Sequence, residues 1–398
     1  MRTANMNYYQ LLDFALGNKK YQELVDTFYQ KYNDPQVDGF SWDDEIQLDM
    51  TYHQIEKQLG IVAMPVYMDI DSPSVDHALS GFEVASDKLP TLKHRYAMNT
   101  KMLRERLILF NSGEGNLTDG IRRQILNNLF ESTENLIIGN HNALTYQRMQ
   151  AVSTGKLTLD TVNNPRGIKG ITFDFAIPVA NIKNLAGNAR WWTNASHVAA
   201  NEGSDADPIQ YFKDWIADFR RRGINIDHFE MDVDLYNDML NHTKVLERIG
   251  LAMAGVVIIQ GGTAASTAIA NAQNMVDEAK AQMVEKLIGK PIKVIDSLSA
   301  VESFDSTAKA LKVTNVKGFK ETNVAAVPTS GQIGTIKSYR QLAFEGDNGQ
   351  QLAWFDGGRT LLTTRYVTET KEMIVESEGG WLTVPSVSKQ MGYGTVTV

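Results

Sequence analysis

The stretch NLTDGIRRQILNNLFESTENLIIGNHNALTYQRMQAVSTGK, residues 116–156, decides the fold of this chain. Asn116 or Thr118 can cap the start of a helix here, and Gly155 can end it. We therefore predict one helix over residues 116–155, which at about 1.5 Å per residue is roughly 60 Å long. Such a rod typically braces an elongated molecule. The apolar residues that recur at helical spacing are Ile121, Ile125, Leu129, Leu136, Leu144, Met149 and Val152.

Composition limits the possible classes of protein. The chain has 398 residues, 43% of them hydrophobic, which is enough to form two or more lobes with buried cores. It carries 39 basic and 47 acidic residues, and this balance argues against sequence-specific nucleic-acid binding. The absence of cysteine excludes disulfides, thiol nucleophiles and thiolate zinc sites. We find no secretory signal in the first twenty residues and no apolar run of the ~20 residues that a membrane span needs, so we expect folding in a cytoplasm.

The residues before the long helix divide into two regions. Residues 6–59 have apolar side chains at spacings of three and four, which predicts short helices in an arm that docks elsewhere. Residues 61–110 have a strand pattern interrupted by Pro65, Pro73 and Pro90. Because proline lacks a backbone donor, this pattern predicts the edge strands of a hairpin that needs a neighbour to lie on.

The residues after the long helix alternate between strands and helices. Two strands flank a turn at residues 163–165, and Asp207 with Pro208 opens a helix that ends at Gly223. Residues 323–398 are expected to be strand and loop throughout. Between these regions we predict strands at 225–234, 291–297 and 311–318, and single helices at 235–250 and 269–289.

Motifs that carry chemistry are scarce. The chain has no phosphate loop, no dinucleotide fingerprint, no HExxH and no GxSxG, and its histidines lack a paired nucleophile. The segment DHFEMDVD could hold a divalent cation through Asp227, His228, Glu230, Asp232 and Asp234. We favour the solvent-facing side of a half-buried strand instead. The sequence therefore predicts no catalytic residue, no cofactor and no metal.

The order of these regions resembles the major capsid proteins of tailed bacteriophages, particularly the lambda-like branch. The resemblance extends from Ile61 to Pro385, and its strength lies in the order of the segments. These segments are VYMDIDSP (66–73), KLPTLKHRYAM (88–98), LTYQRMQAVSTGKLTL (144–159), ITFDFAIP (171–178), the WW pair (191–192), DPIQYFKDWIADFRRRG (207–223), NVAAVPTSGQIGTIKSY (323–339) and RYVTETKEMIVESEGGWLTVP (365–385).

The resemblance implies the α+β tailed-phage capsid fold. Residues 1–60 would be an N-terminal arm, and residues 61–110 an extended loop. Residues 111–185 and 336–398 would form a peripheral domain with the spine helix at 116–155, and residues 186–335 an axial domain. Gly139 near the middle of the spine helix predicts a gentle curve or kink there.

The resemblance also implies a structural role and no enzymatic activity. The chain would assemble as pentamers and hexamers into an icosahedral shell around packaged double-stranded DNA, in the host bacterial cytoplasm. Its expected partners are a separately encoded scaffolding protein, a portal and, optionally, a decoration protein. We expect no covalent crosslink through Lys88 or Lys93. An encapsulin-like compartment shell remains an alternative, followed by a metal-dependent α/β hydrolase, and a tail or portal component is disfavoured.

Eight residues are our candidates for contacts between subunits. They are charged, aromatic or proline residues in the expected extended loop and axial domain, where protruding elements meet neighbours. The candidates are Pro65, Pro90, Lys93, Arg95, Trp215, Arg220, Arg221 and Arg222.

Overall fold

The computed structural model divides the chain into two compact units. The first unit contains residues 1–53, 86–145 and 336–383, and the second contains residues 54–85, 146–335 and 384–398. The residues that the structure describes are 21–32, 38–57, 82–99, 101, 119–254, 263–296, 298–305, 307, 310–342, 350–367 and 369–398.

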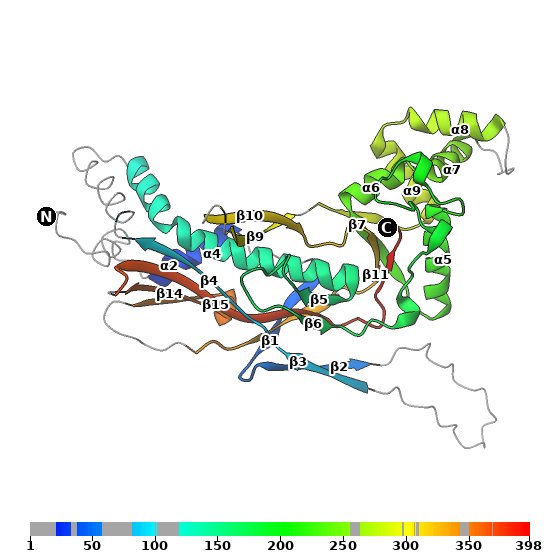
Figure 1. Cartoon of the computed structure of the whole chain (residues 1–398). Helices are drawn as coiled ribbons and strands as arrows, with labels where there is room; N and C mark the ends of the chain where they lie inside the picture. Colours follow the sequence, from blue (N-terminus) through cyan, green and yellow to red (C-terminus); the bar gives the residue numbers. More distant parts are fainter. Residues whose placement is uncertain are drawn as a thin grey trace, which may run out of the picture. The chain divides into compact units, whose positions relative to one another are not determined.

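The first unit is built on a six-stranded sheet in the order β1-β12-β15-β14-β13, with β4 also paired to β15. Helices α2 (Tyr21–Tyr32) and α4 (Asp119–Thr154) pack on one face of it (Figure 1). Asn140 of α4 donates to Ser377 Oγ at 2.7 Å, and Thr364 Oγ1 donates to the Tyr21 hydroxyl of α2 at 2.8 Å. The strands are β1 (Phe40–Gln47), β4 (Thr91–Asn99), β12 (Gly334–Tyr339), β13 (Gln351–Phe355), β14 (Thr360–Val367) and β15 (Glu372–Pro385).

A side-chain amide covers part of the outer edge of β13. Gln22 Nε2 donates to the Trp354 carbonyl at 2.6 Å, and Gln22 Oε1 accepts from the Trp354 backbone N–H at 2.7 Å. Both groups of Trp354 that a further strand would need are therefore satisfied by α2.

The second unit has a four-stranded sheet in the order β16-β11-β7-β8, in which β7 and β8 run parallel. Its core is rich in aromatic side chains, with Phe212, Trp215 and Phe229 each at most 2% exposed. The elements are α5 (Pro208–Arg221), β7 (Ile226–Asp232), α6 (Val233–Leu240), α7 (Thr243–Ala254), α8 (Thr263–Gln273), α9 (Asp277–Ile288), β8 (Ile292–Ile295), β11 (Asn323–Pro328) and β16 (Gly392–Thr395).

Three pairs of strands form separate two-stranded sheets. The pairs are β2 (Thr51–Lys57) with β3 (Phe82–Lys88), β5 (Lys156–Leu159) with β6 (Ile171–Asp174), and β9 (Leu298–Asp305) with β10 (Ala310–Lys317). Short 3-10 helices are η2 (Val179–Asn181), η3 (Gly187–Ala189), η4 (Ala199–Asn201) and η5 (Asp356–Gly358).

Several predicted elements are confirmed. The long helix runs from Asp119 to Thr154, and Gly155 ends it with a positive φ of 67°. Asn116 and Thr118, the expected caps, lie outside the described residues. The turn at 163–165 connects β5 and β6, which pair antiparallel. Helix α5 begins as predicted, since the Asp207 side chain accepts from the Gln210 backbone N–H.

Other predictions are wrong. Residues 40–57 form β1 and β2 and not helices, because Phe40, Trp42 and Ile46 alternate along a strand that pairs with β12. The predicted helix at 235–250 is two helices, α6 and α7, with a break after Asn241. The predicted helix at 269–289 is likewise divided between α8 and α9.

The predicted hairpin in residues 61–110 can be compared only in part. Residues 58–81, with Pro65 and Pro73, lie outside the described part of the chain. The strands that follow are present, but β3 pairs with β2 and β4 pairs with β15. Hence β4 belongs to the large sheet of the first unit, and it is not one arm of an isolated hairpin.

Candidate assembly surfaces

The acidic segment of β7 forms ion pairs. Both terminal nitrogens of the Arg148 guanidinium in α4 donate hydrogen bonds to the Glu230 carboxylate. The distance from Nη1 to Oε2 is 2.6 Å. Arg148 and Glu230 are 3% and 0% exposed. Burial alone would raise the pKa of Glu230, but the charges and hydrogen bonds of Arg148 and His228 hold that pKa below its ordinary value.

Asp232 and Asp234 both form ion pairs with Lys317. Lys317 Nζ lies 3.1 Å from Asp232 Oδ1 and 3.0 Å from Glu321 Oε1, and it also contacts Asp234 Oδ2. These carboxylates raise the Lys317 pKa against the effect of burial, so the lysine stays charged. Asp234 is in the first turn of α6 and does not continue the strand.

The solvent-facing interpretation of this segment is therefore wrong for Glu230 and Asp232. Phe229, Glu230, Met231 and Asp232 are all buried, so both faces of β7 are covered from Phe229 onward, and β11 and β8 flank its edges. Each buried carboxylate has a cation in place of water. Within the described ranges, no group of three or more histidine or acidic side chains could hold a metal ion.

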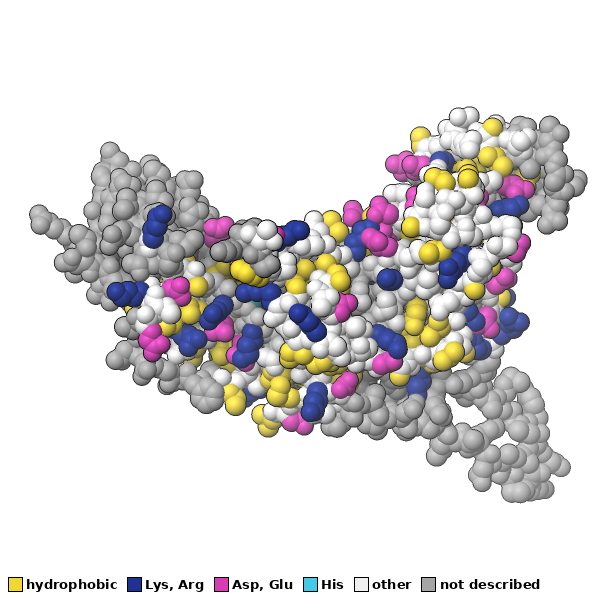
Figure 2. Space-filling model, in the orientation of Figure 1, with side chains coloured by type: hydrophobic (Ala, Val, Ile, Leu, Met, Phe, Trp, Pro, Cys, Tyr) yellow, Lys and Arg dark blue, Asp and Glu magenta, His cyan; other side chains and the backbone are white. Residues whose placement is uncertain are grey.

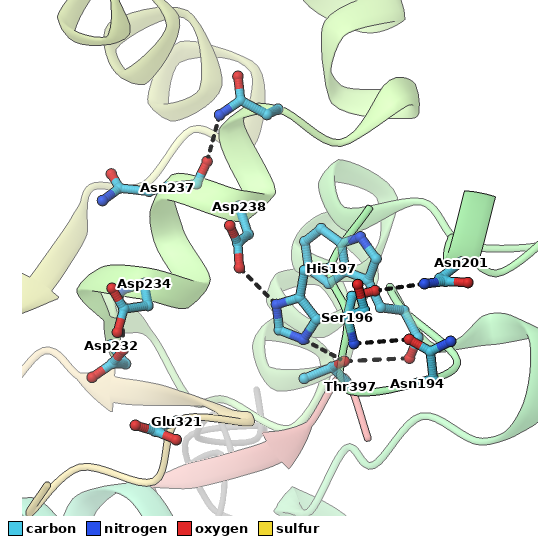
Figure 3. A network of polar contacts seen from close by, with 12 residues as sticks. Asn194, Ser196, His197, Asn201, Asp232, Asp234, Asn237, Asp238, Glu321 and Thr397 are labelled. Atoms are coloured by element: carbon cyan, nitrogen blue, oxygen red, sulfur yellow. Dashed lines mark hydrogen bonds and ion pairs between the residues drawn. The ribbon is translucent and has the colours of Figure 1, made fainter. Parts of the chain in front are cut away.

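A second polar network joins three segments that are distant in sequence (Figure 3). His197 Nδ1 lies 2.6 Å from Asp238 Oδ2, and its Nε2 lies 3.1 Å from Thr397 Oγ1. The imidazole stacks on Trp192 with the ring centroids 4.4 Å apart. The order of acid, imidazole and hydroxyl resembles a nucleophilic triad, but Thr397 is only 1% exposed and has no access to a substrate. The network instead ties the C-terminal residues to α6.

Sequence reasoning missed both networks, since the partners are far apart along the chain. His197 and Thr397 are separated by 200 residues, and Arg148 and Glu230 by 82. The local signal in β7 is a cluster of acidic residues and a histidine that alternate with apolar residues, and it does not identify their partners.

Lys93 and Arg95 lie on the face of the large sheet opposite α2 and α4. Lys93 Nζ pairs with Glu378 Oε1 at 2.7 Å, and this contact raises the Lys93 pKa. Arg95 is exposed and lies opposite Glu376 in the register of β4 and β15. Arg365 Nη2 approaches Glu376 Oε2 at 3.5 Å. We call Lys93, Arg95, Arg365, Glu376 and Glu378 the charged strip.

The remaining candidate residues differ in accessibility. Pro90 is half-buried between β3 and β4, and Pro65 lies outside the described residues. Arg220 and Arg221 are exposed at the end of α5. Trp215 is 2% exposed, so its side chain is used within the core of its own chain.

Arg222 also makes its contacts within the chain. Its guanidinium donates to Asn181 Oδ1 at 2.5 Å and Asp218 Oδ2 at 2.8 Å, and it lies 4.6 Å from the centre of the Phe219 ring. Among the three consecutive arginines, Arg220 and Arg221 therefore remain the better candidates for contacts with another molecule.

The described residues thus form an α+β protein in which the buried carboxylates of Glu230 and Asp232 are paired with Arg148 and Lys317. The sequence model of the phage major capsid protein E family matches residues 30–276, more than half of the chain, and the chain belongs to this family. No curated protein matches the chain in sequence.

Solved structures with similar folds were also found. A phage-related protein from Bordetella bronchiseptica is 11% identical, with 94% of this chain and 95% of that chain covered and a TM-score of 0.44. A putative prophage capsid protein from E. coli CFT073 is 12% identical, covering 98% and 99%, with a TM-score of 0.44. The capsid of Myoviridae phage XM1 is 9% identical, covering 90% and 89%, with a TM-score of 0.41.

The family match confirms the main functional prediction. The protein is a structural component of a phage capsid, and its family is not one of enzymes. The assignment to the lambda-like branch stays a prediction. Within the described residues, none of the helices combines the length and apolar character that crossing a membrane demands.

Proposed function

We propose that this chain assembles as pentamers and hexamers into an icosahedral shell that encloses packaged double-stranded phage DNA. The observation that carries the proposal is the match of residues 30–276 to a major capsid protein family. Assembly takes place in the cytoplasm of the host bacterium, beside a portal and with a scaffolding protein. A decoration protein is a further candidate partner of the finished shell.

The domain assignment is part of this proposal. Residues 1–60 act as the arm, residues 61–110 as the extended loop, and residues 186–335 as the axial domain. The peripheral domain comprises residues 111–185 and 336–398, with α4 as its spine. Two-stranded sheets such as β2–β3 support this assignment, because a pair of strands has too little buried surface to be stable alone.

The charge of the chain suits a container for DNA. The net charge is −8, and Figure 2 shows acidic and basic side chains interspersed over the visible face. A surface of this kind binds phosphates weakly, because affinity for a DNA backbone needs clustered cations. Because the shell protein attracts DNA only weakly, the DNA can move along the inner wall of the shell while it is packaged.

The decisive experiment is electron microscopy of the expressed protein with and without its scaffolding protein. We expect closed shells of uniform size when the scaffold is present. Nucleic acid inside shells isolated from infected cells would separate a capsid from an encapsulin-like compartment that houses an enzyme. If only monomers form under every condition, the proposal fails.

A further inference from the structure

One face of the β9–β10 sheet carries exposed hydrophobic side chains. In the antiparallel register, Leu311 lies opposite Phe304 and Val313 opposite Glu302, so these side chains share a face with Leu298. The exposed fractions are 59% for Leu298, 63% for Phe304, 55% for Leu311 and 59% for Val313.

A neighbouring loop extends this apolar surface. Val162 and Ile168, in the loop between β5 and β6, are 65% and 67% exposed. Arg166 of the same loop approaches Glu302 of β9, with Nη1 3.4 Å from Oε2. Since Glu302 is on the apolar face, this ion pair places the loop beside that face. We call Val162, Ile168, Leu298, Phe304, Leu311 and Val313 the hairpin patch.

The opposite face of the β9–β10 sheet is partly covered by its own chain. Val316, on that face, is 8% exposed, and the following Gly318 accepts a hydrogen bond from Gln150 of α4. A two-stranded sheet with one partly covered face and one bare apolar face is an incomplete packing unit. Soluble proteins rarely expose apolar patches of several hundred Å² without a use for them.

We propose that the hairpin patch is covered by a second copy of this chain in the assembled shell. The inference rests on the proposed shell function, which surrounds each copy with others. Charges of both signs border the patch, because Glu302 and Lys317 share this face in the register of the sheet and Arg166 pairs with Glu302. An apolar centre with a mixed polar rim is typical of a contact between proteins. A DNA backbone or an anionic membrane would instead require cations of one sign.

The size of the patch suits a contact that is repeated in a shell. Six side chains supply on the order of several hundred Å², less than the ~800 Å² that each partner contributes to a standard interface. One such contact holds two copies weakly. Many simultaneous contacts make a closed shell stable, while single subunits remain soluble.

The absence of cysteine allows a direct test. The Leu311→Cys variant has one thiol, at an exposed position. We expect a maleimide to label this thiol at least about tenfold more slowly in shells cleared of scaffold than in free subunits. A Val179→Cys variant, with the residue 83% exposed outside the patch, is the control for access of the reagent.

Three labelling results would overturn the proposal. They are equal rates in shells and free subunits, slow labelling only while scaffold is present, and equal slowing at the control position. The second result would identify the scaffolding protein as the occupant.

A charge variant tests the energetic importance of the patch. The Leu311→Glu/Val313→Glu double variant should lower the yield of shells at least about tenfold, because it buries two carboxylates in an apolar contact. Val179→Glu should assemble normally, and circular dichroism and thermal unfolding should show that both proteins are folded. Full shell yield from the folded double variant would refute the proposed role of the hairpin patch and would leave the proposed shell function unaffected. Failure of the unmodified protein to assemble would refute the proposed function.

If the double variant does not fold, the labelling experiment decides the question.

Discussion

The ion pair between Arg148 and Glu230 shows how a single residue can mislead interpretation of a sequence. An acidic side chain on a strand normally marks the solvent face. Here β7 is covered on both sides, and the carboxylate is stabilised by a guanidinium from a helix 82 residues earlier. The sequence shows the charge but not the partner.

We expect Arg148→Met to lower the free energy of unfolding by about 3–5 kcal/mol, because it leaves the Glu230 carboxylate buried without a partner. The double variant Arg148→Met/Glu230→Leu should recover most of this loss, since it removes both charges. Urea unfolding of the two variants and the parent measures the effect. A loss below about 1 kcal/mol in the single variant would show that water compensates the carboxylate.

His228 should make the stability depend on pH. Its Nε2 lies 3.3 Å from Glu230 Oε1 and its Nδ1 2.8 Å from Asp227 Oδ2, and these contacts raise the His228 pKa above its ordinary 6.5. The folded state therefore favours the protonated ring. The resulting stabilisation is fully present below pH 6.5 and disappears as the pH rises through the folded-state pKa.

The His228→Gln variant isolates this contribution. We expect the stability difference between parent and variant to be larger at about pH 5.5 than at about pH 8.5, on the two sides of an ordinary histidine pKa. Denaturant titrations across this range give the difference directly. A difference that does not change with pH would contradict the assignment.

At the scale of elements, periodicity predicts the long helix well and short segments poorly. The 36 residues of α4 contain many helical repeats, and Gly155 supplies a clear end. In residues 40–57, by contrast, helical and strand spacings both fit, and pairing with a distant strand decides between them. Nothing local in residues 235–250 marks the break after Asn241 as strongly as a glycine or proline would.

Gly139 has a packing role in α4 that the sequence does not reveal. A Cβ atom at this position would lie 2.7 Å from His94 Cε1, and the His94 ring is held by a 3.1 Å contact between Nε2 and the Leu136 carbonyl. We expect Gly139→Ala to destabilise the parent, although alanine favours a helix by about 1 kcal/mol. The curve expected at Gly139 stays a prediction.

In a His94→Ala background, we expect Gly139→Ala to have the opposite effect on stability. With the ring absent, Gly139→Ala should stabilise the protein by about 0.5–1 kcal/mol through helix propensity. Thermal unfolding of the four proteins completes the cycle. If Gly139→Ala changes the stability equally in both backgrounds, contact with the His94 ring is not the reason that position 139 requires glycine.

At the scale of the whole molecule, the order of segments predicts the class of protein, whereas individual contact residues are much less predictable. The family follows from many weak features in sequence order. Contacts depend on which side chains the fold leaves accessible. Trp215 and Arg222 are used inside their own chain, while Lys93, Arg95, Arg220 and Arg221 reach solvent.

We expect Arg95→Glu and Arg221→Glu to impair assembly more than folding, since exposed charges on assembling surfaces guide association. Shell yield should fall at least about threefold, with thermal unfolding nearly unchanged, because isolated surface charges contribute about 1 kcal/mol or less to stability. Lys286→Glu, an exposed change of the same type on α9, serves as the control. Unchanged shell yield in both arginine variants would exclude these positions as contacts.

The amide of Gln22 on the edge of β13 has a further consequence for a protein made in great numbers. Crowded copies with open strand edges can merge their sheets and grow into fibres, a process that competes with orderly closure. Because Gln22 of α2 occupies the N–H and C=O of Trp354, these two groups are not available to a strand of another copy. We therefore expect this contact to favour closure of the shell over aggregation while newly made subunits wait for partners.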